Sequence, residues 1–274
     1  MWLGLLVLVV AVAGAVTVML LVRQQAPEGG YLVDTSRGSS VFGVLGTAFA
    51  VILAFVILLA LQSFNTAKET AAREAVATTQ LYRTTGVLPD PTGVTLRGQL
   101  VCYGRAVIED EWPIMASGRE SARVQGWLDE MGLTVAALVP ADAREATAYD
   151  QWFERDADRR DGRRGRLSEA QPFVPPFVWL VLVLAAVLVV GYMLLFADRR
   201  ERAVVQGLMI GALTAVVVLG LLLVRHLDTP YDGDGGSIAP TEMRRTLALA
   251  EATRLLSSAP TVPPCDAAGV PLRP

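Results

Sequence analysis

Three aspartates follow the last long apolar stretch of the chain, and their carboxylates could hold a metal ion. Asp228, Asp232 and Asp234 stand in a Gly-rich turn that also contains the hydroxyl of Ser237. Ca²⁺ prefers hard oxygen ligands of this kind, but a calcium loop usually ends on a bidentate Glu at its twelfth position, where Met243 stands here. The two interpretations are therefore a calcium site and a solvated turn that ends the apolar stretch. No other cofactor is predicted.

The residue patterns that most enzymes use are missing from this sequence. Its one histidine, His226, has no recognisable nucleophile motif near it. It stands beside Arg225 at the end of an apolar stretch, where a histidine usually faces water. The chain contains no Gly-Lys dipeptide, which excludes a P-loop. We therefore predict that the protein is not an enzyme.

Two cysteines, Cys102 and Cys265, stand far apart in the sequence. Two are too few for a Cys-rich zinc site or for a scaffold held together by many disulfides. A bridge between them would require both to lie on an oxidising side of a membrane. The sequence leaves open whether they pair.

Long uncharged apolar runs surround these residues and indicate a membrane protein. Of the 274 residues, 53% are hydrophobic and only 19% are charged, against about a quarter charged in soluble domains. A helix of about 20 apolar residues is long enough to cross a bilayer core. The net charge of −3 gives no support to nucleic-acid binding. We predict membrane-spanning helices at residues 2–22, 41–61, 173–197 and 203–224.

The predicted spans form two hairpins, so the fold class is all-α and the chain is a multi-pass protein of the cell membrane. No Pro or Gly interrupts the sequence between Leu61 and Gly86, so the second span continues into water as one helix. The parts are the first transmembrane hairpin, a helical soluble domain, the second transmembrane hairpin and a tail, at residues 1–61, 62–172, 173–224 and 225–274.

The soluble domain shows helical periodicity and no strand-like alternation. Apolar residues recur at spacings of three and four, and they predict a second helix with the buried face Leu96, Leu100, Tyr103 and Val107. A third and a fourth helix carry the aromatic residues Trp127, Trp152 and Phe153. The mixed-charge stretch 154–166 is interpreted as a solvated helix end or loop.

The tail is predicted to contain one short helix over residues 241–258. Its apolar residues Met243, Leu247, Ala250 and Leu255 lie roughly on one face, which would let the helix dock on the soluble bundle. Residues 260–274 are Pro-rich and predicted to be disordered.

The positive residues near the spans do not decide the orientation. Lys and Arg favour the cytoplasmic side. They flank the spans at both ends, however, and both orientations stay open. An even number of spans places both termini and the soluble domain on the same side. The arginines of the hairpin loops are Arg23, Arg37, Arg199, Arg200 and Arg202, and on the domain side the positive residues include Lys68, Arg73, Arg225 and the arginines of 159–166.

The order of hairpin, helical domain, hairpin and tail resembles the bestrophin-like family of bacterial membrane proteins, which are distant relatives of bestrophin anion channels. Bestrophins carry an aromatic-rich segment after the second span, which Ala and Thr replace here, and a denser acidic calcium clasp than the three aspartates. The segments that carry the resemblance are Gly43–Val87 with its Gln62-Ser-Phe-Asn-Thr patch, Val174-Pro-Pro-Phe-Val-Trp, and Leu227-Asp-Thr-Pro-Tyr-Asp-Gly-Asp.

The resemblance implies an oligomeric, anion-channel-like pore lined by the second span. Phe49, Ile52 and Val56 would then form a hydrophobic neck that gates by dewetting. Under the alternative interpretation of this span, its small residues, such as Gly43 and Gly46, pack helix on helix.

A second hypothesis is a non-conducting membrane scaffold or sensor whose helical domain binds a protein partner. Its motive is a set of aromatic side chains expected to be exposed, Trp127, Trp152 and Phe153. Both hypotheses place the chain in a lipid bilayer, and the first also requires a homo-oligomer.

Overall fold

The computed structural model of the chain describes residues 2–27, 29–32, 34–233, 235–255 and 262–272. Throughout these ranges the regular structure is helical, and the only β-type pairing is an isolated bridge between Cys265 and Pro271. The prediction of an all-α fold is confirmed. The chain divides into two compact units. We call residues 1–63 and 172–228 the apolar unit, and residues 64–171 and 229–274 the polar unit.

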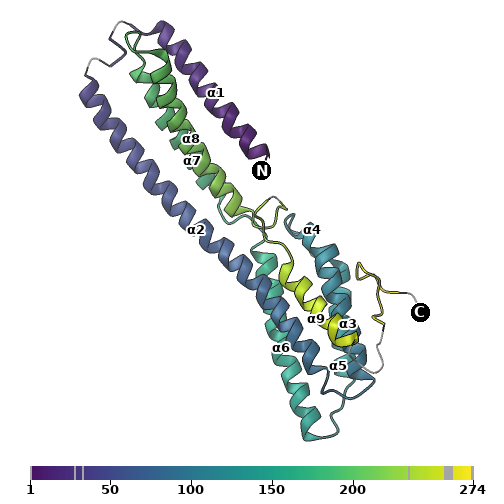
Figure 1. The fold of residues 1–274 in the computed structure, drawn as a ribbon. Helices are drawn as coiled ribbons and strands as arrows, with labels where there is room; N and C mark the ends of the chain where they lie inside the picture. Colours follow the sequence, from purple (N-terminus) through teal and green to yellow (C-terminus); the bar gives the residue numbers. More distant parts are fainter. Residues whose placement is uncertain (1, 28, 33, 234, 256–261, 273–274) are drawn as a thin grey trace. The chain divides into compact units, whose positions relative to one another are not determined.

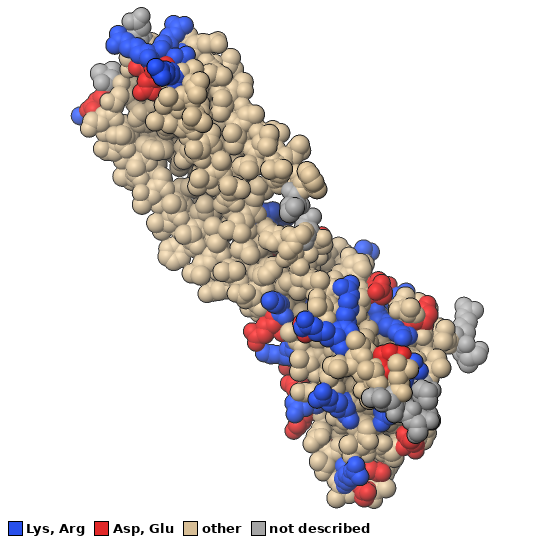
Figure 2. Space-filling model, viewed as in Figure 1, with Lys and Arg blue, Asp and Glu red and all other residues tan. Residues whose placement is uncertain are grey.

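Over its described residues, the apolar unit contains four helices that are long and apolar enough to cross a membrane (Figure 1). Its visible face is largely uncharged, with Lys, Arg, Asp and Glu gathered over the short loops (Figure 2). The four predicted spans are thus found as helices. They are α1 (Trp2–Gln25), the first part of α2 (Thr35–Thr84), α7 (Pro176–Met193, extended by a 3₁₀ turn at Leu194–Phe196) and α8 (Ala203–Asp228).

Glycines bring the helices of the apolar unit close together. At Gly207 and Gly211 of α8, an added Cβ would lie 3.6 Å from Met19 Cε and 3.6 Å from Val12 Cγ1 of α1, so these positions form the contact surface between α1 and α8 (Figure 1). Small residues at such spacing allow apolar helices to approach closely. The Gly207–Gly211 pair therefore has a packing role between α8 and α1.

The polar unit is built from helices whose ends follow local sequence signals. Ser121 caps α5 by accepting a hydrogen bond from Val124 N, and Asp142 caps α6 by accepting one from Glu145 N. The Glu145 carboxylate in turn accepts from Ala141 N, much as in the reciprocal arrangement of a capping box. The elements are the end of α2, α3 (Thr92–Ala106), a π-helical turn (Val107–Glu111), α4 (Trp112–Met115), α5 (Ala122–Ala136), α6 (Ala143–Ser168) and α9 (Thr241–Leu255).

The aromatic residues of the polar unit lie mostly in its core. Trp127 and Trp152 are only 2% and 3% exposed, which corrects the expectation that they are surface residues. Of the three expected aromatics, only Phe153 is substantially exposed. The reason is that the aromatic stripes of α5 and α6 join one core with α3. The core cluster includes the predicted face Leu96, Leu100, Tyr103 and Val107, together with Met131, Val135 and Met243.

The mixed-charge stretch 154–166 is a helix end, one of the two predicted forms, but it is not solvated along its whole surface. It is the second half of α6, and Arg159, Arg163 and Arg166 are buried. These arginines recur at spacings of four and three, so they lie on one face of the helix. That face meets carboxylates from α2 and the π-helical turn, which compensate the buried charge.

The end of the tail is ordered, in contrast to the predicted disorder of 260–274. Over residues 262–272 the chain folds back on α3 and α5, and Cys265 forms a disulfide with Cys102. Gly269 adopts a φ of 74°, and its carbonyl accepts a hydrogen bond of 2.8 Å from Trp127 Nε1. In α9, Met243 and Ala250 are buried as expected, but Leu255 is exposed. Residues 256–261, 273 and 274 lie outside the described ranges.

Candidate functional site

The first part of α2 has one packed face in the apolar unit. Phe49 is 6% exposed and packs with Val189 of α7 and Val217 of α8. Leu53 joins the same cluster and approaches Gly220 of α8 so closely that an added Cβ there would lie 2.7 Å from Leu53 Cδ2. This face therefore holds α2 against its own chain.

The opposite face of α2 is apolar and is not covered by the part of the chain that the structure describes. Successive residues of an α-helix are rotated by about 100° around its axis, which places positions two, six and nine residues after Phe49 on the far side. These positions are Val51, Phe55 and Leu58, which are 49%, 62% and 50% exposed. Burying them requires contacts from outside this chain.

The three residues predicted to form a neck do not share one environment. Phe49 belongs to the packed face, Val56 is half-buried, and Ile52 is 42% exposed at the edge of the uncovered face. Their role in a pore stays a prediction. At Gly43 and Gly46 an added Cβ would meet no atom of the described chain within 4 Å, so no described helix of the same chain packs there.

Asp228, one of the three candidate calcium ligands, has a structural role at the start of α7. Its carboxylate is buried and accepts hydrogen bonds from Val174 N at 2.8 Å and from Trp179 Nε1 at 3.2 Å. Asp232 is exposed, and Asp234 lies outside the described residues. Within the described ranges, no three His, Cys, Asp or Glu side chains cluster as metal ligands would.

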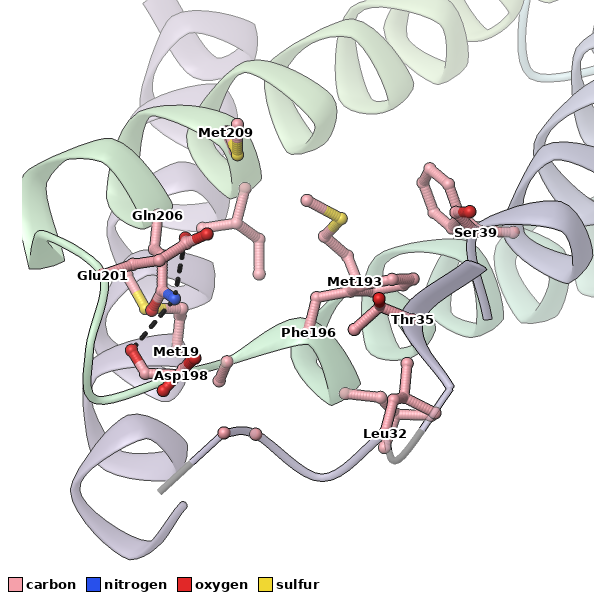
Figure 3. A pocket seen from close by; sticks show the side chains of 16 residues that line it. Met19, Leu32, Thr35, Ser39, Met193, Phe196, Asp198, Glu201, Gln206 and Met209 are labelled. Carbon is pink, nitrogen blue, oxygen red and sulfur yellow. Dashed lines mark hydrogen bonds between the residues drawn. The ribbon is translucent and has the colours of Figure 1, made fainter. Parts of the chain in front are cut away.

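A cavity of about 430 Å³ opens at the loop end of the apolar unit (Figure 3). Its wall is mostly apolar, with Met19, Met193 and Phe196 among the lining residues. At one end the buried Gln206 amide donates to Asp198 O and Glu201 Oε2, both at 3.1 Å, as the dashed lines in Figure 3 show. The cavity is not on the uncovered face of α2.

The polar unit contains a buried network of ion pairs. The guanidinium of Arg166 donates to both oxygens of Glu74, at 2.5 and 3.0 Å, and to Glu111 Oε2 at 2.7 Å. Arg163 donates to Glu111 Oε1 at 2.6 Å, and Tyr103 donates its hydroxyl proton to Glu74 Oε1 at 2.6 Å. Paired and hydrogen-bonded in this way, charges can be kept out of water.

The charges of the network determine its protonation states. Burial opposes ionisation of Glu111, but the hydrogen bond from Arg163 and the charges of Arg166 and Arg163 outweigh it, and the pKa of Glu111 is lowered. Burial and the neighbouring Glu74 carboxylate raise the pKa of the Tyr103 hydroxyl far above its usual range. Glu111 is therefore a carboxylate and Tyr103 a hydrogen-bond donor at neutral pH. The side chains of the network are buried, and they connect α2, α6 and the π-helical turn.

Two glycines allow α6 to reach α2 in the polar unit. An added Cβ at Gly162 would lie 2.5 Å from Glu74 N, and one at Gly165 would lie 2.5 Å from Thr70 Cγ2. Sequence reasoning missed this contact. The sequence does contain a signal for this contact, because Gly162 and Gly165 lie on the same side of α6 as Arg163 and Arg166.

The fold thus defines a class of protein, all-helical over the described residues, with four candidate membrane helices and a second helical unit between and after them. The chain belongs to the bestrophin-like family, because the family model of the bestrophin-like domain matches residues 6–236. No sequence match was found among curated proteins.

Solved structures share the fold at low sequence identity. A point mutant of a bacterial bestrophin homologue from Klebsiella pneumoniae is 15% identical, with a TM-score of 0.69 over 89% of this chain and 98% of that one. A second structure, a point mutant described only as a membrane protein, is 16% identical, with a TM-score of 0.65 over 89% and 96%. The family resemblance inferred from the sequence is confirmed.

Proposed function

We propose that the protein is an oligomeric, anion-channel-like pore of the cell membrane. Its four apolar helices cross the bilayer as two hairpins, and α2 of each copy lines the central axis. The observation that carries this proposal is the uncovered apolar face of α2, opposite the face that packs on α7 and α8. The choice of anions rests on the bestrophin-like family to which the chain belongs.

In a ring of copies, the uncovered face of α2 would lie toward the central axis. Closed rings are the usual form of symmetric assemblies with more than two subunits around one axis. In such a ring, α7 and α8 of each copy lie behind α2, and Val51 and Phe55 point toward the axis. The open space at Gly43 and Gly46 is available for a neighbouring copy, because small residues favour close helix contacts in membranes.

The narrowest part of the pore is proposed at Val51, Ile52 and Phe55. A ring of such side chains repels water when narrow and gates conduction by dewetting. Of the three neck residues expected from the sequence, this proposal keeps Ile52 at the pore. Phe49 and Val56 support the neck from the packed side of α2.

The scaffold hypothesis has less support than the pore. Its motive was a set of exposed aromatics, but Trp127 and Trp152 are buried in the polar unit and only Phe153 of the three is exposed. A partner site on the polar unit would need a different surface.

Oligomeric state in mild detergent tests the proposal. Native mass spectrometry of the purified full chain is expected to give one closed ring with a single subunit number. A monomer that binds only lipid would contradict the pore, because one α2 helix cannot enclose an aqueous path.

A further inference from the structure

We infer that the polar unit faces the oxidising side of the membrane, where the Cys102–Cys265 disulfide clips the end of the chain onto α3, and that the two short loops face the cytoplasm. This inference rests on the proposed hairpin arrangement of the four apolar helices. It does not require the protein to conduct ions.

The disulfide lies within a segment that is built to fit α3. Cys102 is fully buried and Cys265 is 4% exposed, and their Cα atoms are 5.8 Å apart, which is within the usual range for a bridge. Arg105 of α3 donates to Cys265 O at 3.3 Å and to Asp266 O at 3.1 Å. Hydrogen bonds from α3 therefore position the segment around Cys265 in addition to the disulfide.

Close contacts with α3 on both sides of Cys265 also hold the segment in place. Gly269 approaches α3 so closely that an added Cβ would lie 2.6 Å from Ala106 N. On the other side of the cysteine, an added Cβ at Gly98 of α3 would lie 2.8 Å from Pro264 Cδ. The segment is matched in shape to α3, so the pairing of these cysteines belongs to the fold.

A buried structural disulfide indicates on which side of the membrane the polar unit lies. Such bonds form and persist outside the cytoplasm, whereas cytoplasmic glutathione and thioredoxin keep thiols reduced. Both cysteines belong to the polar unit. The compartment of the disulfide is therefore the compartment of that unit.

The charge of the short loops agrees with this orientation. The rule that positive loops stay in the cytoplasm applies to loops below about 60 residues, because longer segments are translocated largely regardless of charge. Residues 62–172 exceed that length as a whole, although the rule also counts positive residues close to a span, and Lys68, Arg166 and Arg225 are such residues on the domain side. The two short loops, with the helix ends that flank them, contain the arginines Arg23, Arg37, Arg199, Arg200 and Arg202.

The disulfide thus favours one of the two orientations that the charges left open. The cavity lined by Met19 and Gln206 lies beside the short loops and therefore opens toward the cytoplasm. Molecules that act on the polar unit must instead reach it from outside.

Two matched variants test the orientation in intact cells. Ser36→Cys lies at the start of α2 and Ser117→Cys follows α4, and both serines are exposed. The native cysteines are buried and bonded, so a membrane-impermeant maleimide reports only the introduced thiol. Ser117→Cys is expected to react in intact cells and Ser36→Cys only after lysis, while both react in detergent.

The reverse pattern would overturn the orientation. Labelling of both sites from one side would overturn the hairpin arrangement of the proposed function itself, so the two failures are distinguishable. The native pair supplies a separate readout on unmodified protein: after denaturation, polyethylene-glycol maleimide should shift the band only if a reductant was added first. Free thiols in protein trapped directly from cells would overturn the inference.

Discussion

Glu74 of α2 and Arg166 of α6 form a bidentate ion pair in the core of the polar unit, although they stand far apart in the sequence. Both guanidinium–carboxylate contacts are 3.0 Å or shorter, and the two side chains are 1% and 0% exposed. Removing one partner of such a pair leaves the other charge buried without compensation. The pair is therefore a sensitive point of the fold.

Replacing Arg166 by Met should destabilise the polar unit by about 3–5 kcal/mol, because Glu74 and Glu111 would be left buried without their shared partner. The matched control is Arg164→Met on the same helix. Arg164 forms an exposed pair with Asp161, and its loss should change stability by less than about 1 kcal/mol. Thermal unfolding in detergent measures both. Equal, small effects of the two variants would contradict the network.

The lowered pKa of Glu111 predicts an acid-sensitive contribution to stability. A carboxyl whose pKa is lowered by folding stabilises the protein above its unfolded pKa, near 4.5, and loses that contribution as the pH falls through the folded value. The melting temperature of the native protein should therefore exceed that of Glu111→Gln most at pH 7. The difference should shrink below about pH 4.5. A difference that stays constant through the acid range would refute this assignment.

The contact between α6 and α2 predicts opposite effects for two glycines. Gly162→Ala should destabilise the protein by about 1–3 kcal/mol or more, because its Cβ would lie 2.5 Å from Glu74 N and 2.8 Å from Glu74 Cα. Gly132→Ala, inside α5 with open space around it, should stabilise by about 0.4–1 kcal/mol. Chemical denaturation of both variants checks the pair. Stabilisation by Gly162→Ala would mean that the helices do not meet there.

Much of the fold could be predicted because its signals are local. Uncharged runs of about 20 residues give the spans. The break at Gly86 places the end of α2, which closes at Thr84, and apolar spacing gives the buried face of α3. Each of these follows from neighbours in the chain.

The rest depended on partners distant in sequence. Whether Arg159, Arg163 and Arg166 are solvated or buried is decided by groups such as Glu74 and Glu111, which no local pattern links to them. In the same way, the order of 262–272 depends on Cys102 and Trp127. The packed face of α2 depends on which side α7 and α8 cover, so Phe49 and Phe55 could not be told apart from the sequence.

Two phenylalanines of α2 should separate pore lining from packing. Phe55→Ala removes a side chain from the uncovered face, and it should raise anion conductance while leaving the melting temperature nearly unchanged. Phe49→Ala leaves a cavity against α7 and α8 and should cost roughly 2 kcal/mol, since lost packing is the main penalty inside a bilayer. Conductance and thermal melting of both variants are compared. A conductance change confined to Phe49→Ala would assign the pore to the other face.

The proposed function is tested most directly by planar-bilayer recording of the purified protein under a chloride gradient. The account predicts discrete unitary currents that reverse near the chloride equilibrium potential, carried by an oligomeric ring with α2 at its axis. Silent membranes containing folded, inserted protein would contradict it.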